Sequence, residues 1–217
     1  MFNETPCLVQ TTVRARGKMP LTHDEAVQIS QIINPIFDEV VADYDFHKYP
    51  ADRYELFQNT FSQLPLNNGL IEESLKWKWG YWHKDNYPGR QQQFVEEAIQ
   101  NWQNYVNQNH NLTSLQTFNW WSNAFNRRTA YISVAYITHL IHHAEPMPII
   151  DQHNYRAMGA FKGQTRDNYH QKKKPSNWND IVFLKQFMQS LLPLLPGRGF
   201  SEFDRFLMMY GRNHAPR

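Results

Sequence analysis

The feature that most constrains the fold of this chain is the spacing of its apolar residues, which recur every three or four positions in segment after segment. Ala26, Ile29 and Ile33 follow this spacing near the amino terminus, and Phe94 and Ala98 follow it in the middle of the chain. A period of this length places apolar side chains on one face of an α-helix. No segment shows the sustained alternation that a half-buried strand requires, so the sequence predicts an all-α fold.

Capping residues and prolines predict where the helices begin and end. Thr22 and Glu25 form a capping-box pattern, so the first helix should begin there and continue to about Tyr44, with a kink or a split at Pro35. Asp151 should open a later helix. The other helices are expected around the apolar stripes Tyr54 to Phe61, Ile71 to Trp79, Phe94 to Tyr105, Leu115 to Phe125, Thr129 to His143, Tyr155 to Phe161, Trp178 to Leu191 and Phe203 to Tyr210.

Length and composition predict one globular unit that spans residues 1–217. The chain has 217 residues, of which 41% are apolar, and this is enough to bury a core. The single cysteine, Cys7, excludes a disulfide framework, a four-cysteine zinc site and a cysteine-bound iron–sulfur cluster. Because free cysteine is typical of a reducing compartment, we expect a cytoplasmic protein. The longest apolar-leaning window, from Tyr131 to Ile141, is well below the ~20 residues of a membrane span, so no membrane partner is expected.

Charge is distributed unevenly along the chain, although the formal net charge is only +2. Acidic residues predominate from Asp24 to Glu55, and basic residues predominate from Arg156 to Lys174. The basic segment has the composition that a phosphate-contacting surface requires, and a solvated basic loop would share that composition. The acidic half of the chain is the feature that best fits a helical protein-interaction domain.

Two neighbouring motifs between Arg127 and Met158 are the most informative part of the sequence. The first reads N-R-R-T-A-Y-I-S-V-A-Y, and the second reads P-M-P-I-I-D-Q-H-N-Y-R-A-M. Together they resemble the catalytic core of the helix-hairpin-helix DNA glycosylase superfamily. In that family a hairpin ends in a basic or polar residue followed by Thr-Ala, and an apolar stretch later leads to an aspartate at the next helix start. Arg128 and Thr129 match the hairpin exit, and Asp151 matches the aspartate.

This resemblance implies a fold, a partner and a set of functional residues. The fold would be a two-lobed helical bundle in which residues 20–65 and 176–212 form one lobe and residues 69–150 form the other. The partner would be double-stranded DNA, and Asp151 would be the catalytic residue that stabilises the sugar cation and activates water. The residues that would contact DNA are Asn126, Arg127, Arg128, Thr129, His153, Arg156 and Lys162.

Two departures from the family pattern bear on function. The family hairpin has two glycines that let backbone amides approach a DNA phosphate, whereas residues 124–127 contain none. At the position where bifunctional members have a lysine nucleophile, this chain has Arg128, whose guanidinium stays protonated and cannot form a Schiff base. We therefore expect base release without lyase activity. The missing glycines favour a non-catalytic DNA-binding module as the alternative.

Aromatic residues are the expected lining of a pocket for an extruded base, because such pockets hold the base partly by stacking. The candidates are Trp77, Trp79, Trp82, Tyr87 and Trp121. Four of them lie around the end of the helix that is expected from Ile71 to Trp79. The alternative for each is ordinary packing in a helical core.

Three histidines, His139, His142 and His143, raise the question of a metal site, because residues four apart share a helix face. No glutamate follows in a His-Glu-x-x-His pattern, and buried or capping histidines near a helix end are more common. We therefore expect neither a metal nor a cofactor.

The resemblance to this superfamily implies a monofunctional DNA glycosylase that leaves an abasic site, and we expect a monomer. The excised base stays open between a damaged purine and a modified pyrimidine. A glycosylated hydroxymethylcytosine of phage DNA is a further hypothesis, under which the protein would be a defence enzyme. Because Asp151 fits an ordinary helix N-cap equally well, a non-catalytic DNA-binding module and a helical protein-interaction domain stay open as alternatives.

Overall fold

The computed structural model describes residues 20–61, 63, 66–108, 111–125, 130–167, 169–170 and 174–216. All regular elements in these ranges are helical and no strand occurs among them, which confirms the predicted all-α class. Within the same ranges, no helix combines the length and the apolar character needed to cross a bilayer.

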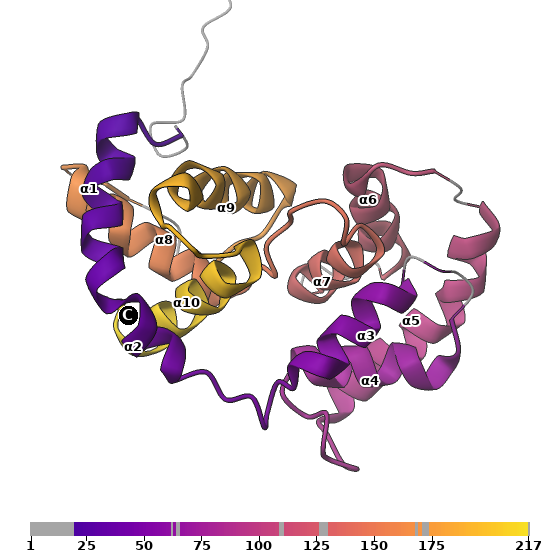
Figure 1. Ribbon diagram of the computed structural model, residues 1–217. Coiled ribbons are helices and arrows are strands. Elements are labelled where there is room, and N and C mark those ends of the chain that lie inside the picture. Colours follow the sequence, from indigo (N-terminus) through magenta and orange to yellow (C-terminus); the bar gives the residue numbers. More distant parts are fainter. Residues whose placement is uncertain are drawn as a thin grey trace, which may run out of the picture.

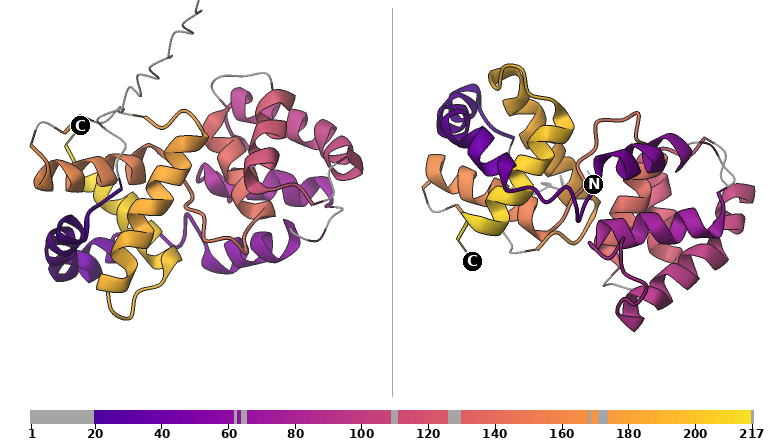
Figure 2. Two further views of the ribbon diagram at one scale, coloured as in Figure 1. Left: turned by 90° about the horizontal axis from the view of Figure 1, so that it is seen from above. Right: turned by 60° about the horizontal axis from the view of Figure 1, so that its bottom comes forward.

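The helices form two lobes that lie side by side (Figures 1 and 2). The chain crosses between the lobes in residues 43–50 and again in residues 142–151. The first lobe consists of α1 (His23–Ile33), a 3₁₀ turn (Asn34–Ile36), α2 (Phe37–Ala42), α8 (Gln152–Thr165), α9 (Trp178–Leu191), a second 3₁₀ turn (Leu192–Leu194) and α10 (Phe200–Asn213). The second lobe consists of α3 (Ala51–Phe61), α4 (Asn68–Lys78), α5 (Gly89–Gln108), α6 (Ser114–Ala124) and α7 (Tyr131–Ile141).

The boundary between the lobes differs from the one expected from the sequence. Residues 20–65 were expected to belong to one lobe, but α3 packs against α4 and α7 of the second lobe. Phe57 and Phe61 of α3 are fully buried, and the Phe61 ring meets the edge of Trp102 of α5 at a centroid distance of 5.3 Å. The apolar face of α3 is therefore used inside the second lobe, and the chain crosses over before α3 rather than after it.

The amino-terminal helix begins and breaks where the sequence predicts. The Thr22 hydroxyl accepts the backbone N–H of Glu25, and the Glu25 carboxylate accepts the backbone N–H of Thr22 at 2.7 Å. The helix gives way to the 3₁₀ turn at Asn34–Ile36, which contains Pro35. Glu25 also binds the guanidinium of Arg166 at the end of α8, with a distance of 2.7 Å between Oε2 and Nη2. This pairing lowers the pKa of Glu25 to about 2 and ties the start of α1 to α8.

The most extensive helix pair in the described ranges is α8 with α10, and it fixes the start of α8. Gly211 of α10 is buried directly against the backbone of His153, so close that a Cβ at position 211 would overlap the His153 carbonyl. Further along the pair, Phe161 stacks on Tyr210 at a centroid distance of 4.4 Å. Because the first turn of α8 is held by backbone contact, Asp151 at its N-cap has a defined position between the lobes.

Candidate functional site

Asp151 is the N-cap of α8, and its two carboxylate oxygens have different surroundings. Oδ1 accepts the backbone N–H groups of His153 at 2.6 Å and Asn154 at 3.0 Å. The Asn154 side chain in turn accepts the backbone N–H of Asp151 at 2.9 Å, which completes a capping box. Oδ2 lies 3.9 Å from the Nζ of Lys78 at the end of α4. One oxygen therefore anchors the carboxylate to α8, while the other faces the neighbouring lobe.

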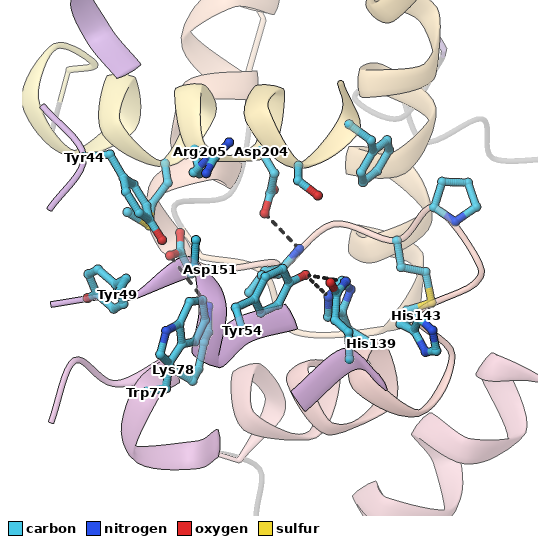
Figure 3. Close-up of a pocket in the computed structure, with 18 of the residues that line it drawn as sticks. Tyr44, Tyr49, Tyr54, Trp77, Lys78, His139, His143, Asp151, Asp204 and Arg205 are labelled. Atoms are coloured by element: carbon cyan, nitrogen blue, oxygen red, sulfur yellow. Dashed lines mark hydrogen bonds and ion pairs between the residues drawn. The ribbon is translucent and has the colours of Figure 1, made fainter. Parts of the chain in front are cut away.

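A pocket of about 300 Å³ opens beside Asp151 and is lined by residues of both lobes. Its walls come from the 43–50 connection, α3, the end of α4, the end of α7, the 142–151 connection and α10. Figure 3 shows Asp151 and Lys78 next to each other at the side of this pocket, with aromatic rings around them. The side chain of Asp151 is 16% exposed, so the carboxylate is in contact with the pocket and is not sealed inside apolar packing.

One wall of the pocket is a stack of flat aromatic side chains. Trp77 stacks on Tyr54 with a centroid distance of 5.0 Å and an angle of 14° between the rings, and Tyr49 meets Trp77 edge-on. The hydroxyl of Tyr54 is 2.5 Å from the Nε2 of His139. Burial lowers the pKa of His139 to about 4, so this histidine is neutral near pH 7. Trp77 also stacks on Tyr136 and Tyr54 also stacks on His139, so these rings pack on one another and together form a largely apolar wall.

A second carboxylate, Asp204 of α10, lies on the opposite side of the pocket from this wall (Figure 3). Oδ2 accepts the backbone N–H of Ile149 at 3.2 Å, and Oδ1 accepts the side-chain amide of Asn154 at 3.2 Å. Burial raises the pKa of Asp204 to about 6, although nearby Lys78 opposes the shift. The pocket thus combines Asp151, whose Oδ1 is bound by the amides of α8, with Asp204, a buried carboxyl group whose pKa is raised.

The three histidines near the end of α7 do not converge on one point. His139 contacts Tyr54, whereas the Nε2 of His142 lies 2.8 Å from the hydroxyl of Thr117. Within the described ranges, no group of three or more His, Cys, Asp or Glu side chains is placed to hold a metal ion.

No family model, curated protein or solved structure matches this chain. The function is therefore inferred from the pocket and from the residues around it.

Of the aromatic residues proposed from the sequence to line a base pocket, the structure places Trp77 in this one. Trp79 caps the end of α4 and packs on Phe94 of α5. The other three have partners elsewhere in the second lobe: Trp82 lies under the guanidinium of Arg53, Tyr87 donates a hydrogen bond to Glu72, and Trp121 is fully buried against Trp102 and Phe125. α4 ends at Lys78 and is followed by Gly80, which has a φ of 71°, so Trp82 and Tyr87 leave the helix and its pocket-facing side. Trp121 lies on α6, whose buried face packs inside the second lobe.

The residues proposed to contact DNA have different environments. Asn126, Arg127, Arg128 and Thr129 lie outside the described residues. His153 is half-buried in the first turn of α8, and Arg156 donates a hydrogen bond to the carbonyl of Gly211 at 3.1 Å. Lys162 is only 2% exposed, with its Nζ 4.2 Å from the centre of the Phe183 ring. In this conformation Lys162 therefore packs inside the first lobe and does not face solvent.

Two charged residues of the pocket, Lys78 and Asp204, were not singled out from the sequence. Asp204 carried a usable signal, because it lies within the apolar stripe of Phe203, Phe206 and Leu207 and is therefore a carboxylate on the buried side of an amphipathic helix. No such signal marked Lys78 in the sequence, because a lysine in the last turn of a helix ordinarily interacts with the helix dipole.

Proposed function

We propose that the protein is a DNA glycosylase that hydrolyses the N-glycosidic bond of an extruded nucleotide and leaves an abasic site. The observation that supports this most strongly is the position of Asp151, with Oδ1 held by the amides of α8 and Oδ2 directed toward an aromatic pocket between two lobes. The motif resemblance around Asp151 supports the same proposal independently.

The chemistry of base release accounts for the position of Asp151. As the N-glycosidic bond breaks, the sugar acquires positive charge, and an anion held close to it lowers the barrier. The backbone amides at the start of α8 stabilise the ionised carboxylate. Because the capping box fixes this group on a helix that is packed against α10, it needs no rearrangement when charge develops. The outward-facing Oδ2 can also orient the attacking water.

The rest of the pocket suits the base. The apolar wall that contains Trp77 and Tyr54 would give a base that has left the duplex a surface to pack against. Asp204 retains a proton up to a pH of about 6, so it is suited to protonate a leaving base at mildly acidic pH. The volume of about 300 Å³ is at the lower end of the roughly 300–1,000 Å³ common for small-ligand sites, which fits one base rather than a longer oligonucleotide.

The proposal is tested with a panel of duplexes, each carrying one modified base. The panel includes alkylated and oxidised purines, deaminated and methylated pyrimidines, and glucosylated hydroxymethylcytosine, which represents the phage-defence hypothesis. Each duplex is incubated with the full-length protein and then heated in alkali, which breaks the strand at abasic sites. We expect alkali-dependent breakage at one class of base. Salt-sensitive binding without breakage in any member would instead indicate a DNA-binding module, and no binding would indicate a protein-interaction domain.

A further inference from the structure

A second hollow, with a volume of about 570 Å³, lies beside the proposed catalytic pocket and is lined mainly by basic and aromatic side chains. We call it the basic groove. It is formed by residues 45–48 of the first connection between the lobes and by residues 79–84, which follow α4. Both segments lie at the same edge of the molecule, at the bottom of Figure 1. The described residues that were expected to contact DNA, His153, Arg156 and Lys162, do not line this groove.

The groove and the pocket are neighbours because the same two segments contribute to both. Along the connection between the lobes, Phe46 and Tyr49 line the pocket, whereas Lys48 lines the groove. At the end of α4, Lys78 lines the pocket, whereas Gly80 lines the groove. A DNA strand whose extruded nucleotide occupies the pocket would therefore pass close to the groove.

Lys48 has a defined position in the groove, because its side chain lies directly over Gly80. Gly80 is buried and has a φ of 71°, and a Cβ at this position would overlap the Cε of Lys48. The glycine therefore leaves the space that the lysine side chain occupies. The backbone on the other side is held by Asp45, whose Oδ1 accepts the N–H groups of His47 and Lys48 at 3.0 Å each.

The groove has an excess of positive charge. Lys48, Lys84, His47 and His83 line it, and Asp45 is the one acidic side chain among the described residues of the lining. Because Oδ1 of Asp45 already binds two backbone N–H groups, this carboxylate does not neutralise the lysines.

The two lysines of the groove have no anionic partner within the part of the chain that the structure describes. Each ammonium group instead lies 5.5 Å from the centre of an aromatic ring, Lys48 above Tyr49 and Lys84 above Tyr81. A contact with the face of a ring leaves the N–H groups of the ammonium available to an anion. Two such amines in one concave site suit a compact anion with several acceptor oxygens, and a phosphate group is one.

We propose that the basic groove binds a backbone phosphate of the DNA strand whose extruded nucleotide enters the pocket. This inference rests on the proposed function for the identity of the strand. Lys48 and Lys84 would pair with the phosphate oxygens and so fix the position of the strand beside Asp151. A contact of this kind positions the DNA and does not read its sequence.

The first test measures the reactivity of each lysine in the wild-type, full-length protein. The protein is treated with an amine-acetylating reagent, alone and with a saturating duplex that carries one tetrahydrofuran residue, and peptide mapping gives the rate at each lysine. We expect the duplex to slow acetylation of Lys48 and Lys84 at least about fivefold, because phosphate contacts bury these amines. Lys185 of α9, in the first lobe, is the internal control and should react at an unchanged rate.

The second test measures duplex affinity as a function of salt concentration. The double variant Lys48→Ala, Lys84→Ala should bind at least about tenfold more weakly than wild type, and the slope of log affinity against log salt should fall by about one unit. Lys185→Ala removes the same charge from another surface and should leave the slope unchanged. With saturating protein, the double variant should release a base at the wild-type rate, because the groove does not touch the reacting atoms.

Unchanged acetylation of Lys48 and Lys84, or an unchanged salt slope of the double variant, would overturn the inference. Equal protection by polyglutamate of matched charge would assign the groove to an acidic protein partner instead. Protection by DNA without base release from any modified duplex would refute the proposed glycosylase and leave the groove as a DNA-binding site. Base release without protection would refute the groove and leave the glycosylase standing.

Discussion

Replacement of Asp151 by Asn should reduce the rate of base release by about 10³-fold or more, while DNA affinity stays within about twofold of wild type. Asparagine is nearly the same size and is an equally good N-cap, so its carbonyl oxygen can still accept the N–H groups of His153 and Asn154. The substitution therefore removes the negative charge and keeps the helix start. Single-turnover kinetics on a substrate found with the duplex panel, together with titration of the same duplex, measure both quantities.

A matched control separates the loss of charge from the loss of a cap. Thr113→Ala removes the capping box at the start of α6, outside the pocket, and should cost about 1 kcal/mol of stability without changing the rate. If Asp151→Asn kept most of the activity, Asp151 would be only an N-cap. If it unfolded the protein while Thr113→Ala did not, the capping role of Asp151 would dominate.

Replacement of Gly211 by Ala should destabilise the protein by about 2 kcal/mol or more, although alanine is the better helix former by about 1 kcal/mol. The new Cβ would overlap the carbonyl of His153, which is backbone and cannot rotate away. Relief of this contact requires α10 to move away from the first turn of α8, where Asp151 lies. We therefore expect base release to slow together with the loss of stability. Urea denaturation and single-turnover kinetics provide the two measurements.

A substitution at Gly163, in the same helix pair, should have the opposite effect on stability from Gly211→Ala. It lies on the exposed side of α8, and a Cβ there would meet no atom within 4 Å. Gly163→Ala should therefore stabilise the protein by up to about 1 kcal/mol and leave the rate unchanged. Stabilisation by both substitutions would mean that α8 and α10 are less closely packed than described, and the argument for a rigidly held Asp151 would lose its basis.

The sequence was most informative where one residue acts on its own neighbours along the chain. The capping box at Thr22, the break at Pro35 and the helix start at Asp151 depend on contacts within a few residues, and the structure has all three. The helical period also identified most of the buried faces correctly. It could not identify which lobe a buried face would join, and this is why α3 was expected in the first lobe.

The candidate site was harder to predict from the sequence, because its residues come from elements that are distant along the chain. Trp77 and Trp121 look alike in sequence, since both are tryptophans on apolar helical stripes, but one lines the pocket and the other is inside the second lobe. The proximity of Lys78 and Asp151 depends on how the two lobes are placed relative to each other, which no local spacing encodes.

The central claim is that a fixed anion lies beneath the sugar of an extruded nucleotide, and one binding measurement tests it without knowledge of the base. A duplex that carries a cationic pyrrolidine in place of one sugar resembles the transition state, whereas a duplex with a neutral tetrahydrofuran has the same shape without the charge. We predict that wild-type protein binds the cationic duplex about 10²-fold more tightly than the neutral one, and that Asp151→Asn loses this preference. Equal affinity of wild-type protein for the two duplexes would contradict the claim.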